Sequence, residues 1–293
     1  MTNELKHPRV SIVNCVSEAL EMLKFSSEQL IGNAGTDNFD YIIVCWHTTP
    51  EVDSFIKGLE RKYKLFHPKL KVFRVNHVEI PNIGYVPNLR AMINEGFTKA
   101  FNLNEYAGLV NTDQAFYKNW LINLVKHCNR KQIVSSVVIM PRPTFEHYQG
   151  DFGITEYGKF NFQKFNKFCN TIIKKNNLRI EQELKGNKCL NLIGFPYLFP
   201  KEMWHEVGPW ILTLEHGTPD VNFFKKAHKQ GFKFVMSLDS IAYHLEGVER
   251  GKVDRPAPNF SKKMKYDPIS LYSKAKIKLK KELFSLLRKL HYK

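Results

Sequence analysis

Apolar segments of two kinds alternate through the first 110 residues. Short β-branched or aliphatic runs typical of strands occur at Arg9–Asn14, Asp40–Cys45, Lys71–Val75 and Gly108–Val110. Between them, apolar residues recur at helical spacing in Ser17–Leu30, Pro50–Tyr63 and Pro87–Phe101. This alternation predicts βαβ units and a mostly parallel α/β sheet flanked by helices. No glycine-rich phosphate loop follows the first strand, which argues against a dinucleotide-binding fold or an NTPase.

The composition predicts a folded, soluble protein. The 293 residues are 43% hydrophobic and 13% aromatic, enough for a full core. No apolar run approaches the 18 residues of a spanning helix, and the amino terminus lacks the apolar core of a secretory signal. The five cysteines form no CxxC pair, so neither a disulfide framework nor a zinc site is expected. We therefore expect a reducing, cytoplasmic location, with peripheral attachment to a membrane left open.

The excess positive charge is concentrated at the carboxyl end. Ser261–Lys293 holds 11 Lys/Arg against two acids, a net charge of +9, which leaves +7 of the total +16 for the other 260 residues. Lys274–Leu290 interleaves lysines with leucines and predicts a basic amphipathic helix. It could lie on an anionic membrane surface, or dock on the main domain or on a second copy of the chain. We expect a main domain at 1–250 and this appendage at 251–293.

The segment Tyr106–Trp120 contains the strongest chemical signal. The strand Gly108–Val110 runs into Asn111-Thr112-Asp113, and Trp120 opens a helix. Two polar residues two apart at a strand end can point the same way, and ligands bind at the carboxyl ends of strands in α/β sheets. A carboxylate there suits Mg²⁺ or Mn²⁺ shared with a diphosphate. A polar turn is the simpler alternative.

Six segments, in order, resemble the GT-A glycosyltransferases of family 2, over roughly Val10–Gly247. They are the first strand Val10–Asn14, the turn Asn82–Tyr85, the Asn-x-Asp segment Asn111–Asp113, the acceptor-side stretch Gly194–Gly208, and the helix Pro219–Lys233 with the closing strand Ile241–Gly247. The resemblance implies the GT-A fold, Rossmann-like and mostly parallel, for residues 1–250. Residues 142–190 have no strong counterpart and are an insertion or an acceptor-side segment.

The resemblance implies a donor site with a metal held by Asp113 and His244; the alternative for His244 is an ordinary strand histidine. Trp46 stands where the family has the aspartate that holds the nucleotide base, so it could stack on a base but a uridine donor is not implied. Either Asn88 or Arg90 faces the diphosphate. The full donor set is Val13, Asn14, Trp46, Asn88, Arg90, Asn111, Thr112 and Asp113.

On the acceptor side the resemblance implies that Asp220 is the general base. Pro219-Asp220 begins a helix, so a helix cap is the alternative role. The family's preceding glutamate is replaced here by Pro219. Trp204, Trp210, Glu215 and His216 are the expected acceptor contacts, although aromatic residues this dense are also typical of a core.

The predicted function is a metal-dependent, inverting glycosyltransferase that moves a sugar from a nucleotide-sugar donor to a hydroxyl of a glycan or a lipid-linked acceptor. Two alternatives belong to other classes. A nucleic-acid-binding protein is suggested by the charge, but the charge lies in one tail and no recognition motif occurs, so no nucleic acid is expected. A sugar nucleotidyltransferase would need an early glycine-rich loop, which is absent.

Overall fold

The computed structural model describes residues 7–17, 20–140, 148–150, 152, 160–175, 181–184, 196–210 and 219–245. The chain divides into two units, Met1–Glu249 and Arg250–Lys293. The predicted basic helix Lys274–Leu290 and two predicted acceptor residues, Glu215 and His216, lie outside the described residues. Within the described ranges, no helix is both long and apolar enough to span a bilayer.

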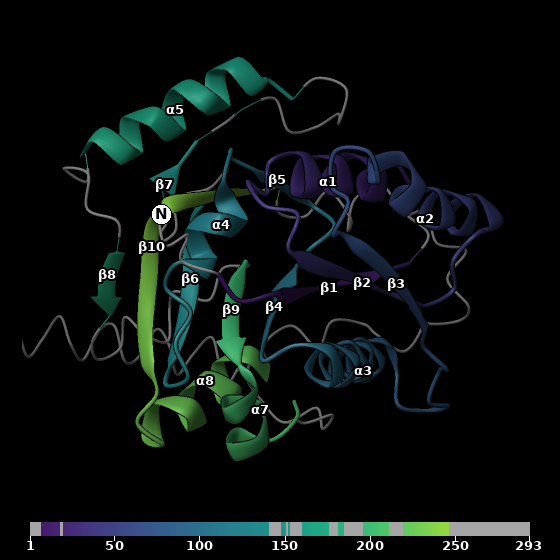
Figure 1. The fold of residues 1–293 in the computed structure, drawn as a ribbon. Coiled ribbons are helices and arrows are strands. Elements are labelled where there is room, and N and C mark those ends of the chain that lie inside the picture. Colours follow the sequence, from purple (N-terminus) through teal and green to yellow (C-terminus); the bar gives the residue numbers. More distant parts are fainter. Residues whose placement is uncertain are drawn as a thin grey trace, which may run out of the picture. The chain divides into compact units, whose positions relative to one another are not determined.

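The first half of the main unit is a parallel βαβ block. Its strands run in the order β3-β2-β1-β4 and are joined by helices, with α1 and α2 on one face and α3 on the other (Figure 1). The strands are β1 (Val10–Val16), β2 (Phe39–Cys45), β3 (Lys71–Asn76) and β4 (Tyr106–Val110). The helices are α1 (Leu20–Gly32), α2 (Pro50–Tyr63) and α3 (Tyr85–Leu103). The predicted βαβ alternation is confirmed.

The second half of the sheet mixes directions. The order continues from β4 through β9 (Tyr197–Pro200), β6 (Gln132–Met140) and β10 (Lys233–His244) to β5 (Gln114–Phe116). β6 and β10 are parallel, whereas β9 is antiparallel to both β4 and β6, and β5 is antiparallel to β10. Two short strands complete the sheet, β7 (Tyr148–Gln149) beside β6 and β8 (Glu181–Leu184) beside β10. The expected α/β sheet is therefore a mixed one.

Side-chain alternation gives the parallel block a core on each face. On β1, Val13 faces α3, whereas Val10 and Ile12 face the side covered by α1 and α2. Gly96 lets α3 approach β1 closely, because a Cβ atom there would lie 2.4 Å from Val13 Cγ1. Strands β1, β2 and β4 are thus buried on both faces, whereas the edge strand β3 is partly exposed.

Further helices cover the second half. The short helix α4 (Trp120–Val125) follows β5, and α7 (Lys201–Val207) with α8 (Pro219–Lys229) joins the core on the α3 face. Helix α5 (Phe162–Lys175) buries Phe165 and Cys169 in a third core against β10. Within segment 142–190, the described part therefore supplies a packed helix, and an acceptor-shaping role for it stays a prediction.

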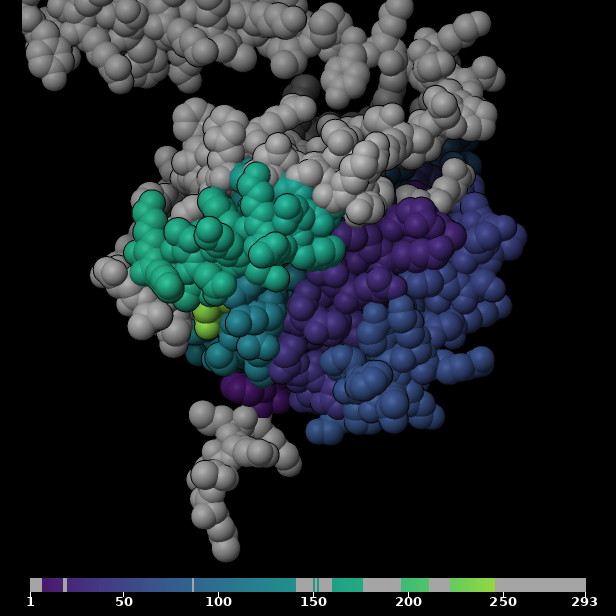
Figure 2. All heavy atoms as spheres, turned by 90° about the horizontal axis from the view of Figure 1, so that it is seen from above, coloured from purple at the N-terminus to yellow at the C-terminus, as the bar shows by residue number. Residues whose placement is uncertain are grey.

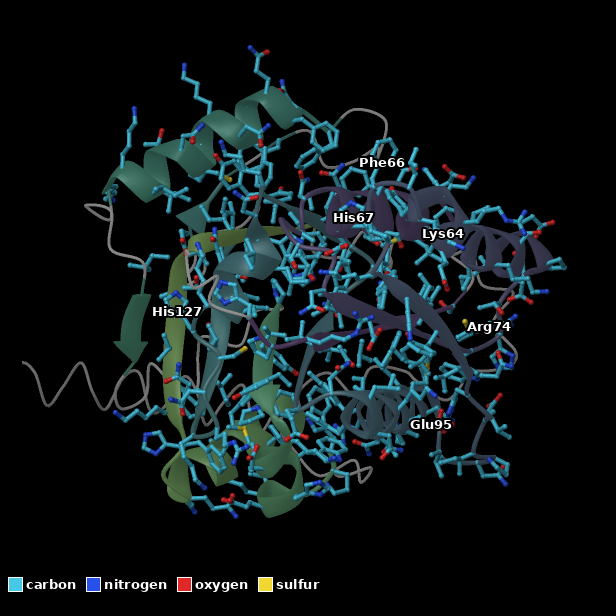
Figure 3. All side chains as sticks on the ribbon, viewed as in Figure 1. Lys64, Phe66, His67, Arg74, Glu95 and His127 are labelled. Atoms are coloured by element: carbon cyan, nitrogen blue, oxygen red, sulfur yellow. The ribbon has the colours of Figure 1, made fainter. Side chains whose placement is uncertain are left out.

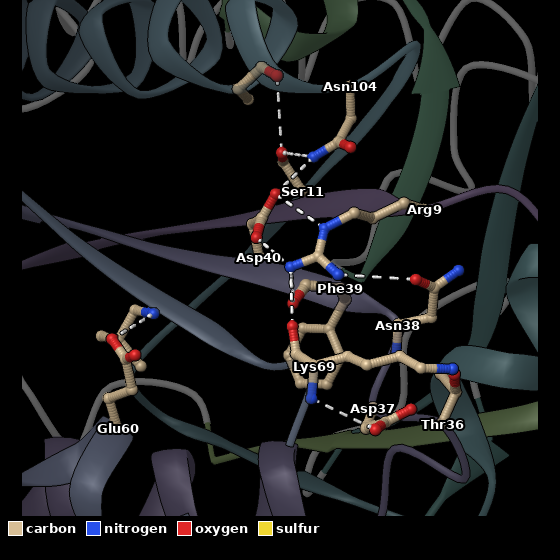
Figure 4. A network of polar contacts seen from close by, with 12 residues as sticks. Arg9, Ser11, Thr36, Asp37, Asn38, Phe39, Asp40, Glu60, Lys69 and Asn104 are labelled. Carbon is tan, nitrogen blue, oxygen red and sulfur yellow. Dashed lines mark hydrogen bonds and ion pairs between the residues drawn. The ribbon is translucent and has the colours of Figure 1, made fainter. Parts of the chain in front are cut away.

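A closed polar network lies where β1 and β2 begin (Figure 4). The buried Asp40 carboxylate accepts hydrogen bonds from Arg9 Nε at 3.2 Å and from Asn104 Nδ2 at 2.7 Å. Asn104 Nδ2 also donates to Ser11 Oγ at 2.8 Å, and Arg9 Nη2 donates to the Lys69 carbonyl at 2.8 Å. This network ties the starts of three strands together at the amino edge of the sheet.

Candidate active site

The carboxyl ends of the parallel strands lie along the opposite edge of the sheet. The ladder continues one residue beyond β2 and β3, since Trp46 N donates to Val16 O at 3.0 Å and His77 N donates to Cys45 O at 2.8 Å. Asn14 of β1 pairs with Val110, the last residue of β4. The first residues after β2, β3 and β4 therefore share one edge with Asn14, the edge at which open α/β sheets bind ligands.

Asp113 and His244, 131 positions apart in the sequence, meet at this edge. After β4 the chain turns directly into β5, and Asn111 N donates to Gln114 Oε1 at 2.9 Å within the turn. β5 pairs with the end of β10, so that Gln114 lies opposite His244 and Leu245 N donates to Asp113 O at 2.8 Å. His244 Nε2 consequently lies 3.1 Å from Asp113 Oδ1.

The geometry of this pair fits a divalent cation. Ligands in adjacent positions of an octahedron, each about 2.1 Å from the ion, are about 3 Å apart, which matches the separation of His244 Nε2 from Asp113 Oδ1. Asn111 Nδ2 lies 3.5 Å from the same histidine nitrogen. In the described part of the chain no cluster of three or more His, Cys, Asp or Glu side chains could hold a metal. Asp113 and His244 could supply two ligands to such an ion, which usually keeps water or phosphate oxygens in its shell.

Trp46, at the end of β2, is almost fully covered. Its ring stacks on Tyr85 with the ring centroids 5.3 Å apart, and meets His77 edge-on at 5.8 Å. The indole is 8% exposed, and its Nε1 is buried with no hydrogen-bond partner among the described residues. One face of the ring is therefore occupied by Tyr85, while a buried donor remains to be satisfied. Base stacking by Trp46 stays a prediction.

His77 and Glu95 were not anticipated from the sequence, and they stabilise this part of the edge. The buried His77 ring contacts Glu95 Oε1 through Nδ1 at 2.9 Å and Asn88 Oδ1 through Nε2 at 3.0 Å. Asn88 is fixed in this orientation, because its Nδ2 donates to the carbonyls of Ile80 and Gly84 while Ile80 N donates to its Oδ1. The His77 ring is thus held between the Glu95 carboxylate and the Asn88 amide. A signal in the sequence that could have singled out His77 is its position just after the predicted strand Lys71–Val75.

These contacts bear on the predicted donor set. The Asn88 side chain holds the loop before α3, and Arg90 lies buried two residues further along the helix. Val13 is a core residue, and Thr112 is buried beside Asp113. Asn14 Nδ2 donates to Tyr41 Oη at 2.8 Å, whereas its buried Oδ1 has no partner among the described residues. Donor contacts by these residues stay predictions.

The two predicted acceptor tryptophans pack in the core. Trp204 lies against Phe97 and Phe101, with ring centroids 5.2 and 5.9 Å away. Trp210 is buried too, and its backbone N–H and C=O are both bonded to the Asn94 amide at 2.9 Å. Their rings therefore have a packing role in this structure, and acceptor contact by either stays a prediction.

Helix α8 packs against β9 and the start of β10. Phe224 of α8 meets Tyr197 edge-on at 5.2 Å, and Tyr197 pairs with Leu109 near the carboxyl end of β4. The helix then runs toward Phe232 and the start of β10, at the opposite edge. Asp220 lies in the first turn of α8, although its side chain is outside the described part.

The comparisons with known proteins agree with this arrangement. Three solved structures match 80–82% of the chain: GalNAc-T7 with UDP, GalNAc and Mn²⁺ (TM-score 0.52, 14% identity), the mannosyltransferase PcManGT from Pyrobaculum calidifontis with GDP-Man and Mn²⁺ (0.51, 15%), and S. aureus TarS (0.50, 12%). The match covers 44%, 58% and 36% of those chains, respectively, so this chain spans well under two thirds of each. No family model and no curated protein matches the sequence. The chain has the GT-A fold of these glycosyltransferases.

Proposed function

We propose that the protein is a metal-dependent, inverting glycosyltransferase that moves a sugar from a nucleotide-sugar donor to a hydroxyl acceptor, either a glycan or a lipid-linked sugar. The observation that carries the proposal is the 3.1 Å contact between Asp113 Oδ1 and His244 Nε2 at the carboxyl edge of a GT-A sheet. Mn²⁺ or Mg²⁺ is the proposed cofactor, since two of the similar structures were solved with Mn²⁺.

On the donor side, Asp113 and His244 would hold the ion through one oxygen and one nitrogen. A divalent ion bound there would offset the negative charge that develops on the departing nucleoside diphosphate. The hydrogen bonds from Asn111 N to Gln114 Oε1 and from Leu245 N to Asp113 O hold the backbone of this turn, which would limit the reorganisation needed when the donor binds.

On the acceptor side, Asp220 is the proposed general base. It would accept the proton of the acceptor hydroxyl while that oxygen attacks the anomeric carbon from the face opposite the leaving group, which inverts the configuration. The support is the resemblance, which puts a base at the start of this helix, and Asp220 lies in the first turn of α8.

A thermal-shift screen tests the proposal. UDP-, GDP-, dTDP- and CMP-sugars are added with and without Mn²⁺, and the true donor should raise the unfolding midpoint through binding to the folded state. Asp113→Ala should abolish the metal-dependent part of the shift. Asp37→Ala is the matched control, since Asp37 is a carboxylate at the amino edge, where its Oδ2 accepts from Lys69 N. Absence of any shift in the wild-type chain would oppose the proposal.

A further inference from the structure

Two large apolar side chains protrude from the turn that follows α2. Leu65 is 82% exposed and Phe66 is 77% exposed. The turn is firmly held, since Phe66 N and His67 N both donate to Tyr63 O, at 3.0 and 2.8 Å. Lys69 is fixed on both sides, its N–H by Asp37 and its carbonyl by Arg9. The apolar pair is therefore held exposed by a hydrogen-bonded turn, on which Figure 3 labels Lys64, Phe66 and His67.

The same turn is strongly basic. Arg61–Lys71, which we call the basic turn, contains five Lys/Arg and no acidic residue. The nearest acids are engaged: Glu28 pairs with Lys62 at 2.6 Å, and Glu60 accepts from Val72 N at 3.4 Å. Exposed apolar side chains flanked by lysines and arginines, such as Leu65 and Phe66 in the basic turn, are typical of a peripheral membrane contact.

Helix α5 extends the positive surface. Its apolar face is buried in the third core, its four lysines are exposed, and it contains no acidic residue. The lysines are Lys164, Lys167, Lys174 and Lys175. Phe25 of α1 touches Phe162 of α5, with ring centroids 6.0 Å apart, and the Glu28–Lys62 ion pair joins α1 to α2. Helices α5, α1 and α2 thus adjoin on one face of the molecule (Figure 2).

We propose that this face docks on a bilayer containing anionic phospholipid, with Leu65 and Phe66 inserted below the headgroups and the lysines of α5 and the basic turn against them. A soluble polyanion would engage the lysines but would leave two nearly fully exposed apolar side chains in water. A bilayer interface accommodates both features. The proposal does not depend on the sugar-transfer proposal, because none of these residues belongs to the candidate active site.

The insertion is tested with Phe66→Trp in the full chain. All four native tryptophans are buried, so the introduced indole would be the one exposed fluorophore of its kind. We expect its emission to be quenched by vesicles of phosphatidylcholine and phosphatidylserine with brominated acyl chains, and to be unaffected by vesicles without phosphatidylserine. Val78→Trp is the matched control, since Val78 is 79% exposed but lies beside Glu79 after β3. Its indole should remain unquenched.

The charge contribution is tested by co-sedimentation. Lys164→Gln with Lys167→Gln should weaken binding to the anionic vesicles about tenfold, whereas Lys225→Gln with Lys226→Gln on α8 should leave it unchanged. Vesicle binding without quenching of the indole introduced at residue 66 would overturn the proposal, since contact would then be made elsewhere on the chain. A response of that indole to single-stranded RNA but not to vesicles would also overturn it.

Discussion

The two edges of the parallel block are built from similar residues and differ in how their polar atoms are satisfied. At the amino edge, the Asp40 carboxylate, the Asn104 amide and the Arg9 guanidinium all bond one another or the backbone (Figure 4). At the carboxyl edge, the buried atoms Asn14 Oδ1 and Trp46 Nε1 have no partner among the described residues. A buried polar atom without a partner costs about 1–3 kcal/mol.

This difference separates stability from ligand binding within one sheet. The closed network holds the starts of three strands together through bonds within the protein. The carboxyl edge retains donors, acceptors and the Asp113–His244 pair, which a bound nucleotide sugar and cation could satisfy. Substitutions at the two edges should therefore alter different measurements.

The largest effect is expected for Asp220→Asn. Loss of a general base typically lowers the rate about 10²–10⁴-fold, so transfer should fall by that amount while donor binding persists. Stability should change little, because removing a negative charge from the first turn of a helix typically costs about 0.3–1 kcal/mol. Steady-state transfer and donor titration measure the two properties. Retained transfer would remove Asp220 from the role of base.

Substitutions at the amino edge should lower the stability of the fold and leave donor affinity unchanged. Arg9→Met leaves the buried Asp40 carboxylate without its cationic partner, and should lower the free energy of unfolding by about 3 kcal/mol. Lys24→Met breaks the exposed pair with Glu21 and should cost under about 0.5 kcal/mol. Urea unfolding measures both. If Arg9→Met lost more donor affinity than its unfolded fraction explains, the amino edge would contribute to ligand binding, and the assignment of stability to one edge and binding to the other would be wrong.

Alkaline pH should destabilise the fold through Tyr41, which lies between the two edges. Burial raises the pKa of Tyr41 from 10.0 to about 12, despite hydrogen bonds from Ser27 and Asn14. Between those values the unfolded chain has lost this proton and the folded chain retains it, so stability falls as pH rises. The loss should be about 1.4 kcal/mol per pH unit from pH 10 to 12. Tyr41→Phe should flatten this part of the urea-unfolding profile; an unchanged slope would exclude Tyr41 as its source.

The smallest expected effect is the difference in unfolding free energy between two Trp→Phe substitutions. Trp120 Nε1 donates to Leu30 O at 3.0 Å, whereas Trp46 Nε1 has no partner among the described residues. Both Phe substitutions remove similar volume, so Trp120→Phe should cost about 1 kcal/mol more than Trp46→Phe, the net value of one hydrogen bond. Equal losses in chemical unfolding would indicate that Trp46 Nε1 is already satisfied, for instance by water.

Local chemistry explains how much of the fold could be predicted from the sequence. The start of α2 was placed correctly because Thr49 caps it and Pro50 opens it, with Thr49 Oγ1 accepting from Val52 N at 3.4 Å. Strands β2 and β4 were recognised because their buried runs are almost continuously apolar, and β1 and the partly exposed edge strand β3 were recognised from their β-branched residues. The antiparallel insertion of β9 between β4 and β6 was not, because strand pairing is set by tertiary contacts.

In the candidate site, too, some residues could be chosen from the sequence, whereas the contacts between them required the structure. Asp113 and His244 were selected from separate motifs, and the β5–β10 pairing that brings them together has no local signal in a three-residue strand. Asn88 was expected to face a donor, but its amide geometry depends on a loop that the sequence alone does not place. His77 was missed because a single histidine after a strand is uninformative until Glu95, 18 positions away, is known to face it.

Manganese binding in the presence of a nucleoside diphosphate tests the central claim most directly. Electron paramagnetic resonance of free Mn²⁺, titrated with protein and with UDP or GDP in turn, should show one ion bound by the wild-type chain and by Asp37→Ala. Because UDP and GDP bind Mn²⁺ themselves, Asp113→Ala should leave the free-ion signal at the level measured for Mn²⁺ and nucleotide without protein. Binding of Mn²⁺ by Asp113→Ala with wild-type affinity would contradict the assignment of the metal site to Asp113 and His244.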